Sequence, residues 1–487
     1  MLRPTSILTK KIAIAMSGGV DSSVCAYLLS KQHPTSSLIG VHMSNWTSFD
    51  AERCRQSEAS WRLVKQTCAQ LDIECKNVSF EQDYVSDVFD PFVEKFQKHL
   101  TPNPDVSCNR LIKFGVLSRW VAEKYGSDAL LATGHYARLT PSYELRAALD
   151  SSKDQSYFLA TVKKEAWKNV LFPLGDLYKK KPKSGSGLGS GSGSGSVREI
   201  AIEADLPSKN EKESFGICFI NESAKNSNPM SLPPTPTPSP APTPSLPSPS
   251  PPQTKIDKKK RADENTNKNK NTKKRDRKQV PYKPNQGDGR RQTFNNFMDD
   301  YVNTDVNPQK FRTTFVNVET NLEVGSGSSR SSVFFTIGQG ARIGGEKTKW
   351  FVCGKDAETD RILVCDGTHH PALFVDEVIV DEFCWQGEVV GGGMFGGRGG
   401  YLCRVRHLGK LVKCWIRRLD AEEEGGKVLV QFEEGVRGVA LGQICVVYES
   451  GESGEGGVVV GGGEIVQKGQ TAFEKETKEG NDTKAFF

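Results

Sequence analysis

The segment Ser17-Gly18-Gly19-Val20-Asp21-Ser22 decides the fold, because an apolar strand pattern at residues 11–16 precedes it and a helical pattern at residues 24–29 follows it. A strand, a glycine turn and a helix start gather backbone N–H groups and the positive end of a helix dipole around one point. Such a point suits a phosphate group. Asp21 could hold a Mg²⁺ ion that the phosphates share, and Ser17 and Ser22 could donate hydroxyl hydrogen bonds.

The spacing within this glycine segment separates it from two common nucleotide-binding loops. It is neither the G-x-x-x-x-G-K-S/T of a Walker A loop nor the G-x-G-x-x-G of a dinucleotide-binding turn. It resembles the pyrophosphatase loop (PP-loop) of enzymes that split ATP into AMP and pyrophosphate to adenylate an oxygen. An ordinary glycine turn is the alternative, and the strand before and the helix after it argue against that reading.

Strand and helix patterns alternate through the first third of the chain. Apolar strand patterns lie at residues 12–15, 38–43, 75–80 and 129–133. Helical patterns lie between them, at residues 24–29, 55–71, 83–99 and 111–125. This alternation predicts the α/β class, with a doubly wound parallel sheet that binds ligands at the carboxyl ends of its strands. Gly134 directly follows the last of these strands, so we expect it at the same edge as the glycine turn.

Two inserts interrupt the later part of the chain. Residues 184–196 are almost entirely Gly and Ser, whereas residues 221–292 are rich in Pro, Ser and Thr and then in Lys. Residues 255–278 alone carry twelve basic and four acidic residues, while the whole chain has a net charge of +6. The basic segment is therefore either an RNA-binding or targeting tail or a solvated surface loop. We favour the loop, because long surface insertions cost little stability.

The last part of the chain has a different character. From about Phe334 onward, short alternating strand patterns separated by glycine turns predict a small β-barrel. Twelve cysteines without any C-x-x-C argue against a zinc ribbon or a thioredoxin motif. No apolar run reaches membrane-spanning length and no secretory signal is evident, so we expect a reducing compartment and no membrane partner. The first eleven residues are basic and lack acids, which is compatible with a short organellar targeting segment or with a plain N-terminus.

Residues 101–109 read Thr-Pro-Asn-Pro-Asp-Val-Ser-Cys-Asn and form the second informative stretch. Its two prolines predict a rigid loop that ends at a helix start, where partial positive charge would favour a thiolate at Cys108. Asp105 could serve as a general acid/base or as an orienting group. Cys218 lies in a second, strand-like run at residues 216–220. Taken alone, either cysteine is more often a buried structural residue.

Together these motifs resemble the tRNA-specific 2-thiouridylase family, in its mitochondrial eukaryotic form. The matching segments, in order, are residues 15–22, 42–46, 101–109, 112–114, 132–138, 153–159, 172–175, 216–220 and 336–339. The resemblance implies a PP-loop ATP pyrophosphatase domain over residues 1–172 and a small central tRNA-binding domain over 173–320, which carries both inserts. It implies a C-terminal β-barrel domain over 321–487. It also implies a mitochondrial location.

The resemblance also implies roles for individual residues. Cys218 matches the cysteine that receives a persulfide sulfur, and Cys108 matches the partner that releases the sulfur and forms a disulfide with it. Asp105 matches the acid/base. The residues that match the ATP site are Ala15, Met16, Ser17, Gly18, Gly19, Val20, Asp21, Ser22, Met43 and Gly134. Those that match tRNA contacts are Asn103, Pro104, Asp105, Lys153, Asp154, Gln155, Arg404 and Val405. Residues 404–407 read R-V-R-H where the family usually has R-Y-R-Q.

The implied function is ATP-dependent 2-thiolation of the wobble uridine in tRNA anticodon loops. Adenylation of the uracil C2 oxygen would precede sulfur transfer from a cysteine persulfide, with ATP and Mg²⁺ as cofactors. A persulfide donor, such as a cysteine desulfurase or a sulfur-relay protein, would be the partner. An iron–sulfur cluster on Asp105, Cys108 and Cys218 stays open, although persulfide chemistry needs only two thiols.

Two other functions compete with this hypothesis. A PP-loop amidating ligase would use the same nucleotide loop but would need neither cysteine. A non-catalytic tRNA-binding protein would rely on the basic insert and would be expected to have lost the nucleotide loop. Asp21 and both glycines of that loop are present.

Overall fold

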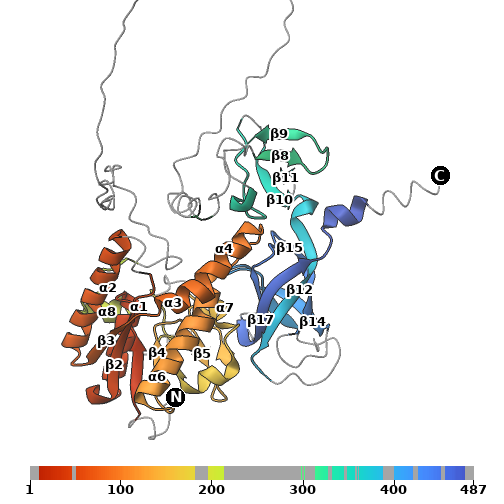
Figure 1. The fold of residues 1–487 in the computed structure, drawn as a ribbon. Coiled ribbons are helices and arrows are strands. Elements are labelled where there is room, and N and C mark those ends of the chain that lie inside the picture. The colour runs from red at the N-terminus through yellow and green to blue at the C-terminus, as the bar shows by residue number, and fades with distance from the viewer. Residues whose placement is uncertain are drawn as a thin grey trace, which may run out of the picture.

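The structure is a computed structural model that places an α/β part and a β-barrel side by side (Figure 1). It describes residues 10–46, 51–180, 196–212, 298, 301, 313–326, 332–344, 348–356, 359, 361–387, 400–419, 426–450 and 456–477. Cys218, the Pro/Lys-rich insert and all but the last residue of the Gly/Ser insert lie outside the described residues. No helix in the described ranges is long and apolar enough to cross a membrane.

Five parallel strands form the sheet of the α/β part, in the order β3-β2-β1-β4-β7. These strands are β1 (Ile12–Ala15), β2 (Leu38–Met43), β3 (Glu74–Val78), β4 (Leu130–Thr133) and β7 (Val170–Leu171). The central strand β1 has alternate side chains in two different core clusters, one on each face of the sheet. A strand covered on both faces is typical of a parallel sheet. The predicted doubly wound α/β fold is therefore confirmed.

Helices cover both faces of this sheet. The first are α1 (Val20–Ser30), α2 (Ala51–Gln70), α3 (Glu81–Tyr84), α4 (Asp90–Gln97), α5 (Pro104–Ser107) and α6 (Ser118–Tyr125). Two π-helical segments, η3 (Val85–Phe89) and η4 (Cys108–Leu117), connect neighbouring α-helices without a break. The helical patterns predicted at residues 83–99 and 111–125 correspond to these composite helices. Short π segments occur often at functional sites, and η4 begins at Cys108.

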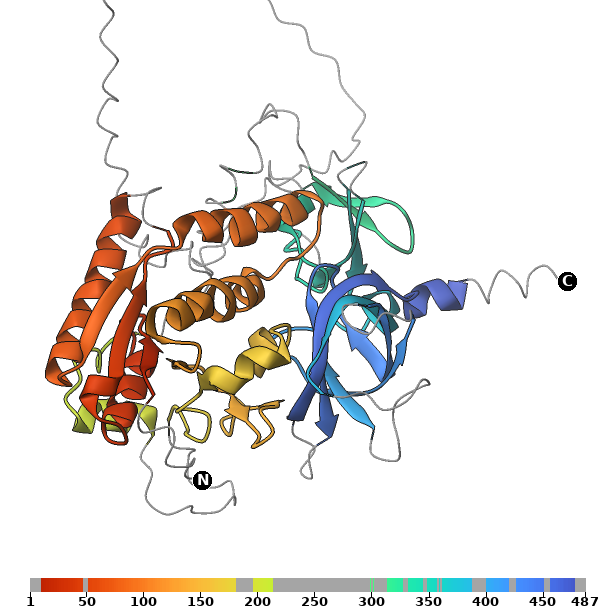
Figure 2. The same cartoon turned by 60° about the horizontal axis from the view of Figure 1, so that its bottom comes forward.

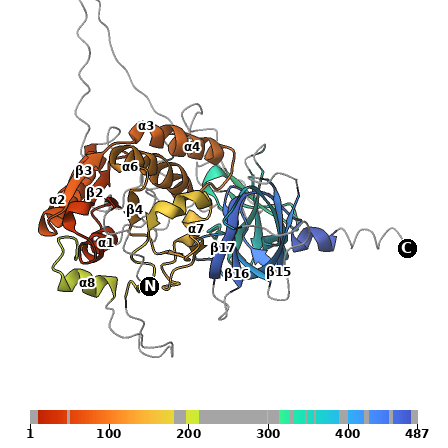
Figure 3. The ribbon, with the colours of Figure 1, turned by 90° about the horizontal axis from the view of Figure 1, so that it is seen from below.

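Shorter elements follow the fourth strand of the sheet. They are β5 (Arg138–Leu139), β6 (Leu145–Arg146), α7 (Ser156–Leu159), the 3-10 helix η5 (Lys164–Asn169) and α8 (Val197–Glu203). Helix α8 lies beside α1 (Figure 3). The contact is apolar, because Val197 and Ala201 of α8 share a buried cluster with Val20 and Val24 of α1. The segment after residue 173 therefore packs on the helix that follows the glycine turn.

Six antiparallel strands form a closed barrel near the C-terminus, in the order β12-β15-β14-β13-β16-β17, with β17 pairing back to β12. They are β12 (Phe374–Trp385), β13 (Tyr401–Arg404), β14 (Val412–Arg418), β15 (Val428–Arg437), β16 (Ile444–Ser450) and β17 (Gly456–Lys468). Closure pairs the edge strands with each other. The predicted C-terminal β-barrel is confirmed.

A separate four-stranded sheet precedes the barrel, in the order β10-β11-β8-β9. Its strands are β8 (Thr314–Asn317), β9 (Glu323–Ser326), β10 (Trp350–Asp356) and β11 (Arg361–Asp366). The sequence placed β10 and β11 in the barrel region, whereas they belong to this separate sheet, in which β11 pairs with β8. This sheet spans the boundary that the sequence analysis drew between residues 320 and 321, and the domain limits stay predictions.

The barrel lies beside the α/β part (Figure 2), and buried polar contacts join the two. The Tyr157 hydroxyl donates to the Ile444 carbonyl at 2.8 Å, and the Trp167 Nε1–H donates to Gln386 Oε1 at 2.7 Å. The Gln386 amide donates in turn to the Val162 carbonyl at 2.6 Å. Since buried polar groups are costly to leave unpaired, these bonds fix the orientation of the barrel against the α/β part.

Candidate active site

The glycine turn between β1 and α1 is held in shape by its own serines. The Ser17 N–H donates to Ser22 Oγ at 3.2 Å, and the Ser22 hydroxyl donates to the Gly19 carbonyl at 3.1 Å. Gly18 has φ +81°, and a Cβ there would lie 2.7 Å from the Ser60 carbonyl oxygen, so only glycine fits. Gly19 is the N-cap of α1 and has no side chain to cap the helix. The first N–H groups of α1 therefore lack a capping side chain and suit a phosphate.

The turn after β4 closes against this loop. A Cβ on Gly134 would lie 3.0 Å from the main chain of Asp21 and Ser22, so the two turns are in contact. The Tyr136 hydroxyl donates to Asp21 Oδ1 at 2.8 Å. The expectation that Gly134 lies at the same sheet edge as the glycine turn is confirmed. The aromatic partner of Asp21 was not predicted, because only the fold brings residues 21 and 136 together.

Other residues expected at the ATP site contribute mainly to the core or to its margin. The Met16 side chain is buried, with its sulfur 3.4 Å from Cys68 Sγ, while its N–H donates to the Val41 carbonyl. Val20 is buried in the α1–α8 cluster. Met43 is partly buried at the carboxyl end of β2, and Ala15 has the same place on β1. Ala15, Met16 and Met43 thus lie at the carboxyl ends of β1 and β2, and Val20 begins α1 after the glycine turn.

The helix that carries Cys108 begins earlier than the sequence suggested. Asn103 is its N-cap, with Oδ1 accepting from the Asp105 N–H at 3.2 Å, and Pro104 occupies the first helical position. Asp105 therefore lies in the first turn, and Cys108, 2 % exposed, lies one turn further along. Because the helix dipole acts mostly within the first turn, its effect on the Cys108 thiol is weaker than we expected.

Asp105 faces charged groups from two parts of the molecule. Burial raises the pKa of its carboxyl, and the charge of Lys113 and, when its ring is protonated, that of His407 oppose this shift. His407 comes from the barrel, between β13 and β14, and its ring lies 4.2 Å from that of Phe158. The candidate site is therefore built jointly by the α/β part and the barrel.

His135 links Lys113 to the turn after β4. Its Nε2 lies 3.5 Å from the Lys113 ammonium, and its Nδ1 lies 2.7 Å from Thr133 Oγ1. An ammonium can only donate, so Nε2 accepts and the Nδ1–H donates to the threonine. Burial, followed by the charge of Lys113, lowers the pKa of His135 well below its usual value. The ring is accordingly a neutral acceptor at pH 7.

The expected tRNA contacts at residues 153–155 and 404–405 meet one another in the structure. The Asp154 carboxylate is 2 % exposed and accepts from Arg404 at 3.2 Å. Gln155 Oε1 accepts from the Tyr136 N–H at 2.9 Å, and Val405 is buried in the barrel core. Lys153 is partly exposed. In this arrangement Asp154 and Arg404 bind the barrel to the α/β part, and a tRNA contact by these residues stays a prediction.

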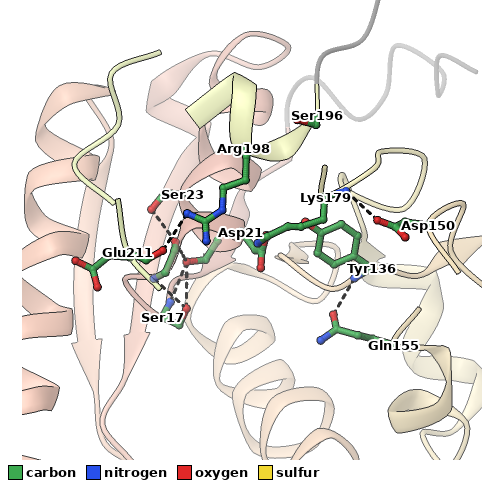
Figure 4. A network of polar contacts seen from close by, with 12 residues as sticks. Ser17, Asp21, Ser23, Tyr136, Asp150, Gln155, Lys179, Ser196, Arg198 and Glu211 are labelled. Carbon is green, nitrogen blue, oxygen red and sulfur yellow. Dashed lines mark hydrogen bonds and ion pairs between the residues drawn. The ribbon is translucent and has the colours of Figure 1, made fainter. Parts of the chain in front are cut away.

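Lys179 is the most prominent site residue that the sequence analysis missed. Its ammonium forms an ion pair with Asp21 Oδ1, and it reaches Asp21 from its own loop alongside Tyr136 (Figure 4). Lys179 stands in a run of lysines before the Gly/Ser insert, where a solvated surface charge is the usual expectation. The one available signal was its place a few residues after the motif at 172–175.

The chain on either side of the Gly/Ser insert is joined by hydrogen bonds. The Val197 N–H donates to the Tyr178 carbonyl at 2.9 Å, and the Arg198 N–H donates to the Lys179 carbonyl at 3.4 Å. Ser196 caps α8 in a reciprocal arrangement with Glu199. The insert therefore leaves and rejoins the fold at one place, beside the glycine turn.

Comparisons with known proteins agree with this architecture. Residues 10–222 match the family model described as the tRNA methyl transferase HUP domain, and residues 375–465 match the Aminomethyltransferase beta-barrel domain. The tRNA-specific 2-thiouridylase MnmA of Protochlamydia amoebophila is 31 % identical over 475 residues, 96 % of each chain. The protein of the same name from Chlamydia felis is 29 % identical over 93 % of this chain and 98 % of its own.

A solved structure, the U34-tRNA thiolase NcsA from Methanococcus maripaludis with its 4Fe-4S cluster, is 29 % identical over 27 % of this chain and 40 % of its own. Its TM-score is 0.20. The similarity to the Protochlamydia protein, in contrast, extends through the α/β part, both sides of the inserts and the barrel. The chain belongs to the tRNA-specific 2-thiouridylase family.

Proposed function

We propose that this protein is a tRNA-uridine 2-sulfurtransferase, which uses ATP to replace the C2 oxygen of the wobble uridine with sulfur. One observation carries the proposal: the turn Gly134-His135-Tyr136 connects the phosphate loop to the cysteine helix. Gly134 and Tyr136 contact Asp21, while His135 contacts Lys113, whose charge acts on Asp105. The nucleotide site and Asp105, the acid/base near Cys108, thus lie at the same edge of the parallel sheet. The names of the relatives support tRNA as the substrate.

The first step activates an oxygen that is otherwise a poor leaving group. The uracil C2 oxygen attacks the α-phosphorus of ATP, a new O–P bond forms, and the bond to pyrophosphate breaks. The N–H groups and the dipole of α1 stabilise charge on the phosphates. Asp21 offers the carboxylate oxygen that Mg²⁺ prefers, with the phosphates as further ligands, and the ion would supply charge neutralisation. Uracil loses its N3 proton as the C2 oxygen is adenylated. The Asp105 carboxylate, whose pKa is raised by burial, can accept this proton and return it when sulfur has replaced the oxygen.

The second step replaces the adenylated oxygen with sulfur. The terminal sulfur of a Cys218 persulfide attacks C2, and AMP leaves with the former C2 oxygen. Cys108 then attacks the Cys218 sulfur, so the S–S bond of the adduct breaks and a Cys108–Cys218 disulfide forms. The electron pair of the broken bond stays on the sulfur attached to C2. A thiol reductant must reset the disulfide, and a persulfide donor must reload Cys218.

Several parts of the proposal come from the sequence and the family. A wobble base is reached most readily in an anticodon loop, where bases leave the stack at low cost. The proposed mitochondrial location rests on the resemblance to the mitochondrial form of the family and on the long inserts of this chain. An alternative chemistry would use an iron–sulfur cluster held by Asp105, Cys108 and Cys218. Metal analysis of anaerobically purified protein distinguishes this alternative from persulfide transfer.

The test is a reconstituted reaction with ATP, Mg²⁺, a persulfide donor and unmodified tRNA, followed by mass spectrometry of the nucleosides. We expect 2-thiouridine and AMP, with both lost in Asp21→Ala. Cys218→Ser should lose the thiolated product. An aminated nucleoside formed independently of both cysteines would favour the amidating ligase instead. Thiolation that persists in Cys218→Ser would contradict the proposed sulfur route.

A further inference from the structure

Lys179 is a buried lysine at the phosphate loop. Its side chain is 4 % exposed, whereas that of its partner Asp21 is 38 % exposed. Its ammonium also lies 5.8 Å from the centre of the Tyr136 ring. In the described part of the chain, Asp21 is the one carboxylate that pairs with this ammonium. A lysine buried to this extent with a single, partly exposed counter-ion is rare in a protein.

The position of this charge is unfavourable for the folded protein alone. Asp21 lies in the first turn of α1, so the ammonium of Lys179 sits near the positive end of the helix dipole. A cation there is repelled by the dipole, which favours anions. Asp21 offsets one positive charge, but the loop N–H groups and the dipole remain. The arrangement therefore holds more positive charge than one carboxylate balances, and this suits a polyanion.

The backbone of Lys179 is fixed on both sides. Its N–H donates to Asp150 Oδ2 at 3.0 Å, and its carbonyl accepts from the Arg198 N–H. The neighbouring Leu174 and Val197 belong to the apolar cluster that joins α8 to α1. With the main chain held, the flexible four-carbon side chain can move its ammonium over a short arc without a change in the fold.

We infer that Lys179 binds the pyrophosphate part of ATP, and that its ammonium transfers from Asp21 to the β- and γ-phosphates when the nucleotide enters. This rests on the proposed function and adds a substrate-binding residue from outside the loop. Asp21, released from the lysine, is then free to take the metal ion. A lysine in this place stabilises the charge that develops on the leaving pyrophosphate.

A purely structural role for Lys179, as a counter-ion of Asp21, predicts different behaviour in a double variant. If the lysine only neutralises Asp21, removing both charges restores the site. If the lysine binds phosphate, removing both charges leaves the site without its cation. We therefore compare Lys179→Met, Asp21→Asn and the double variant, with Lys180→Met as the matched control, since Lys180 is exposed and adjacent.

The measurement is binding of inorganic pyrophosphate by calorimetry in the presence of EDTA, so that no metal ion contributes. We expect Lys179→Met to weaken binding about 10- to 100-fold, as for the loss of a charged hydrogen bond. Asp21→Asn should bind at least as tightly as the wild type, and the double variant as weakly as Lys179→Met. Lys180→Met should bind like the wild type. Thermal melting confirms that each variant is folded, and the double variant leaves no unpaired charge.

Two outcomes would overturn the inference. Wild-type binding by Lys179→Met would show that the lysine does not touch the phosphates. Wild-type binding by the double variant would show that it serves only Asp21. Either result leaves the proposed function standing. A wild-type protein that neither binds pyrophosphate nor releases it from ATP would contradict the proposed function as well.

Discussion

The pKa values of single residues in the site depend on their surroundings more than on the residue type. Burial raises the pKa of Asp105 and lowers that of His135, and both shifts favour the neutral form. Lys113 lies between them, and its ammonium donates a hydrogen bond to His135 Nε2. None of these shifts follows from the sequence, because they depend on which segments are packed together. The sequence identified Asp105 by its spacing from Cys108, whereas His407 required the barrel to be in place.

Asp105→Asn should separate stability from activity. The folded-state pKa of Asp105 is raised, so the folded protein binds more protons than the unfolded chain between the two pKa values. Stability therefore falls as the pH rises through that window. The variant has no carboxyl group at this position, so its stability should not fall over this pH window. At pH 7 it should therefore melt at the same or a higher temperature than the wild type. Its thiolation activity should fall about 10²- to 10⁴-fold, because the acid/base is lost.

The control for this variant is Asp128→Asn, whose carboxylate is exposed. Melting curves recorded from pH 4 to pH 8 and single-turnover thiolation provide the two readouts. A melting temperature that depends on pH as in the wild type, or full activity in Asp105→Asn, would contradict the assignment.

At the level of elements, long patterns were easier to predict than short or composite ones. The bounds of β1 and β2 coincide with the predicted strands, because runs of four to six mostly apolar residues make a clear signal. β7 has two residues and carries no pattern of its own. The π segments η3 and η4 continue the α-helices they join, so each composite helix gives one helical pattern in the sequence. The pairing of β11 with β8, which joins β10 and β11 to one sheet with β8 and β9, is a long-range contact that local patterns do not encode.

Deletion of residues 184–195 should be tolerated. Tyr178 and Val197 are already joined by a hydrogen bond, and five residues remain to connect Lys179 to Val197. Such a length is common for a tight connection, and shortening a loop lowers its closure entropy by roughly 0.6 kcal/mol per halving. We expect an unchanged or slightly higher melting temperature and wild-type release of AMP.

Ser196→Ala is the comparison for this deletion, since it breaks the cap of α8. Loss of such a cap costs about 0.5–2 kcal/mol and should lower the melting temperature. If the deletion destabilised the protein more than the loss of the cap, the insert would be part of the fold.

At the level of the whole molecule, the barrel and the α/β part share one site and one interface. The interface contains the pair of Asp154 with Arg404, the Gln386 amide and the Tyr157 hydroxyl. His407 comes from the barrel and lies close enough to Asp105 to affect the pKa of its carboxyl. The orientation of the barrel therefore matters for the chemistry, although no reacting cysteine belongs to it in the proposed mechanism.

Asp154→Ala tests whether the buried pair holds the two parts together. Removing one partner leaves the Arg404 charge buried, and this typically costs about 3–5 kcal/mol of unfolding free energy. Urea denaturation of the full chain measures the loss. Asp376→Ala breaks the exposed pair with Lys475 and should change the free energy by less than about 1 kcal/mol. A stable Asp154→Ala protein with reduced tRNA affinity would support the original tRNA contact instead.

Deletion of residues 229–278 tests the basic insert as a whole. We expect turnover close to that of the wild type, because the site residues described above lie in other segments. The dependence of tRNA binding on salt is measured from 50 to 200 mM and should be unchanged if the insert does not neutralise phosphates. Each lost phosphate contact would reduce the slope of log affinity against log salt concentration by about 0.7–0.9. A large loss of activity or a shallower slope would identify the insert as an RNA-binding tail.

The paired backbone at Tyr178 and Val197 offers a practical attachment point for a reporter. Because a hydrogen bond joins the chain on either side of the Gly/Ser tract, we expect that a fluorophore or a small tag can replace the tract without disturbing the architecture. The adjoining Lys179 is the residue that nucleotide entry should displace. Light emission from this position would then register loading with ATP in real time, separately from any readout on the RNA.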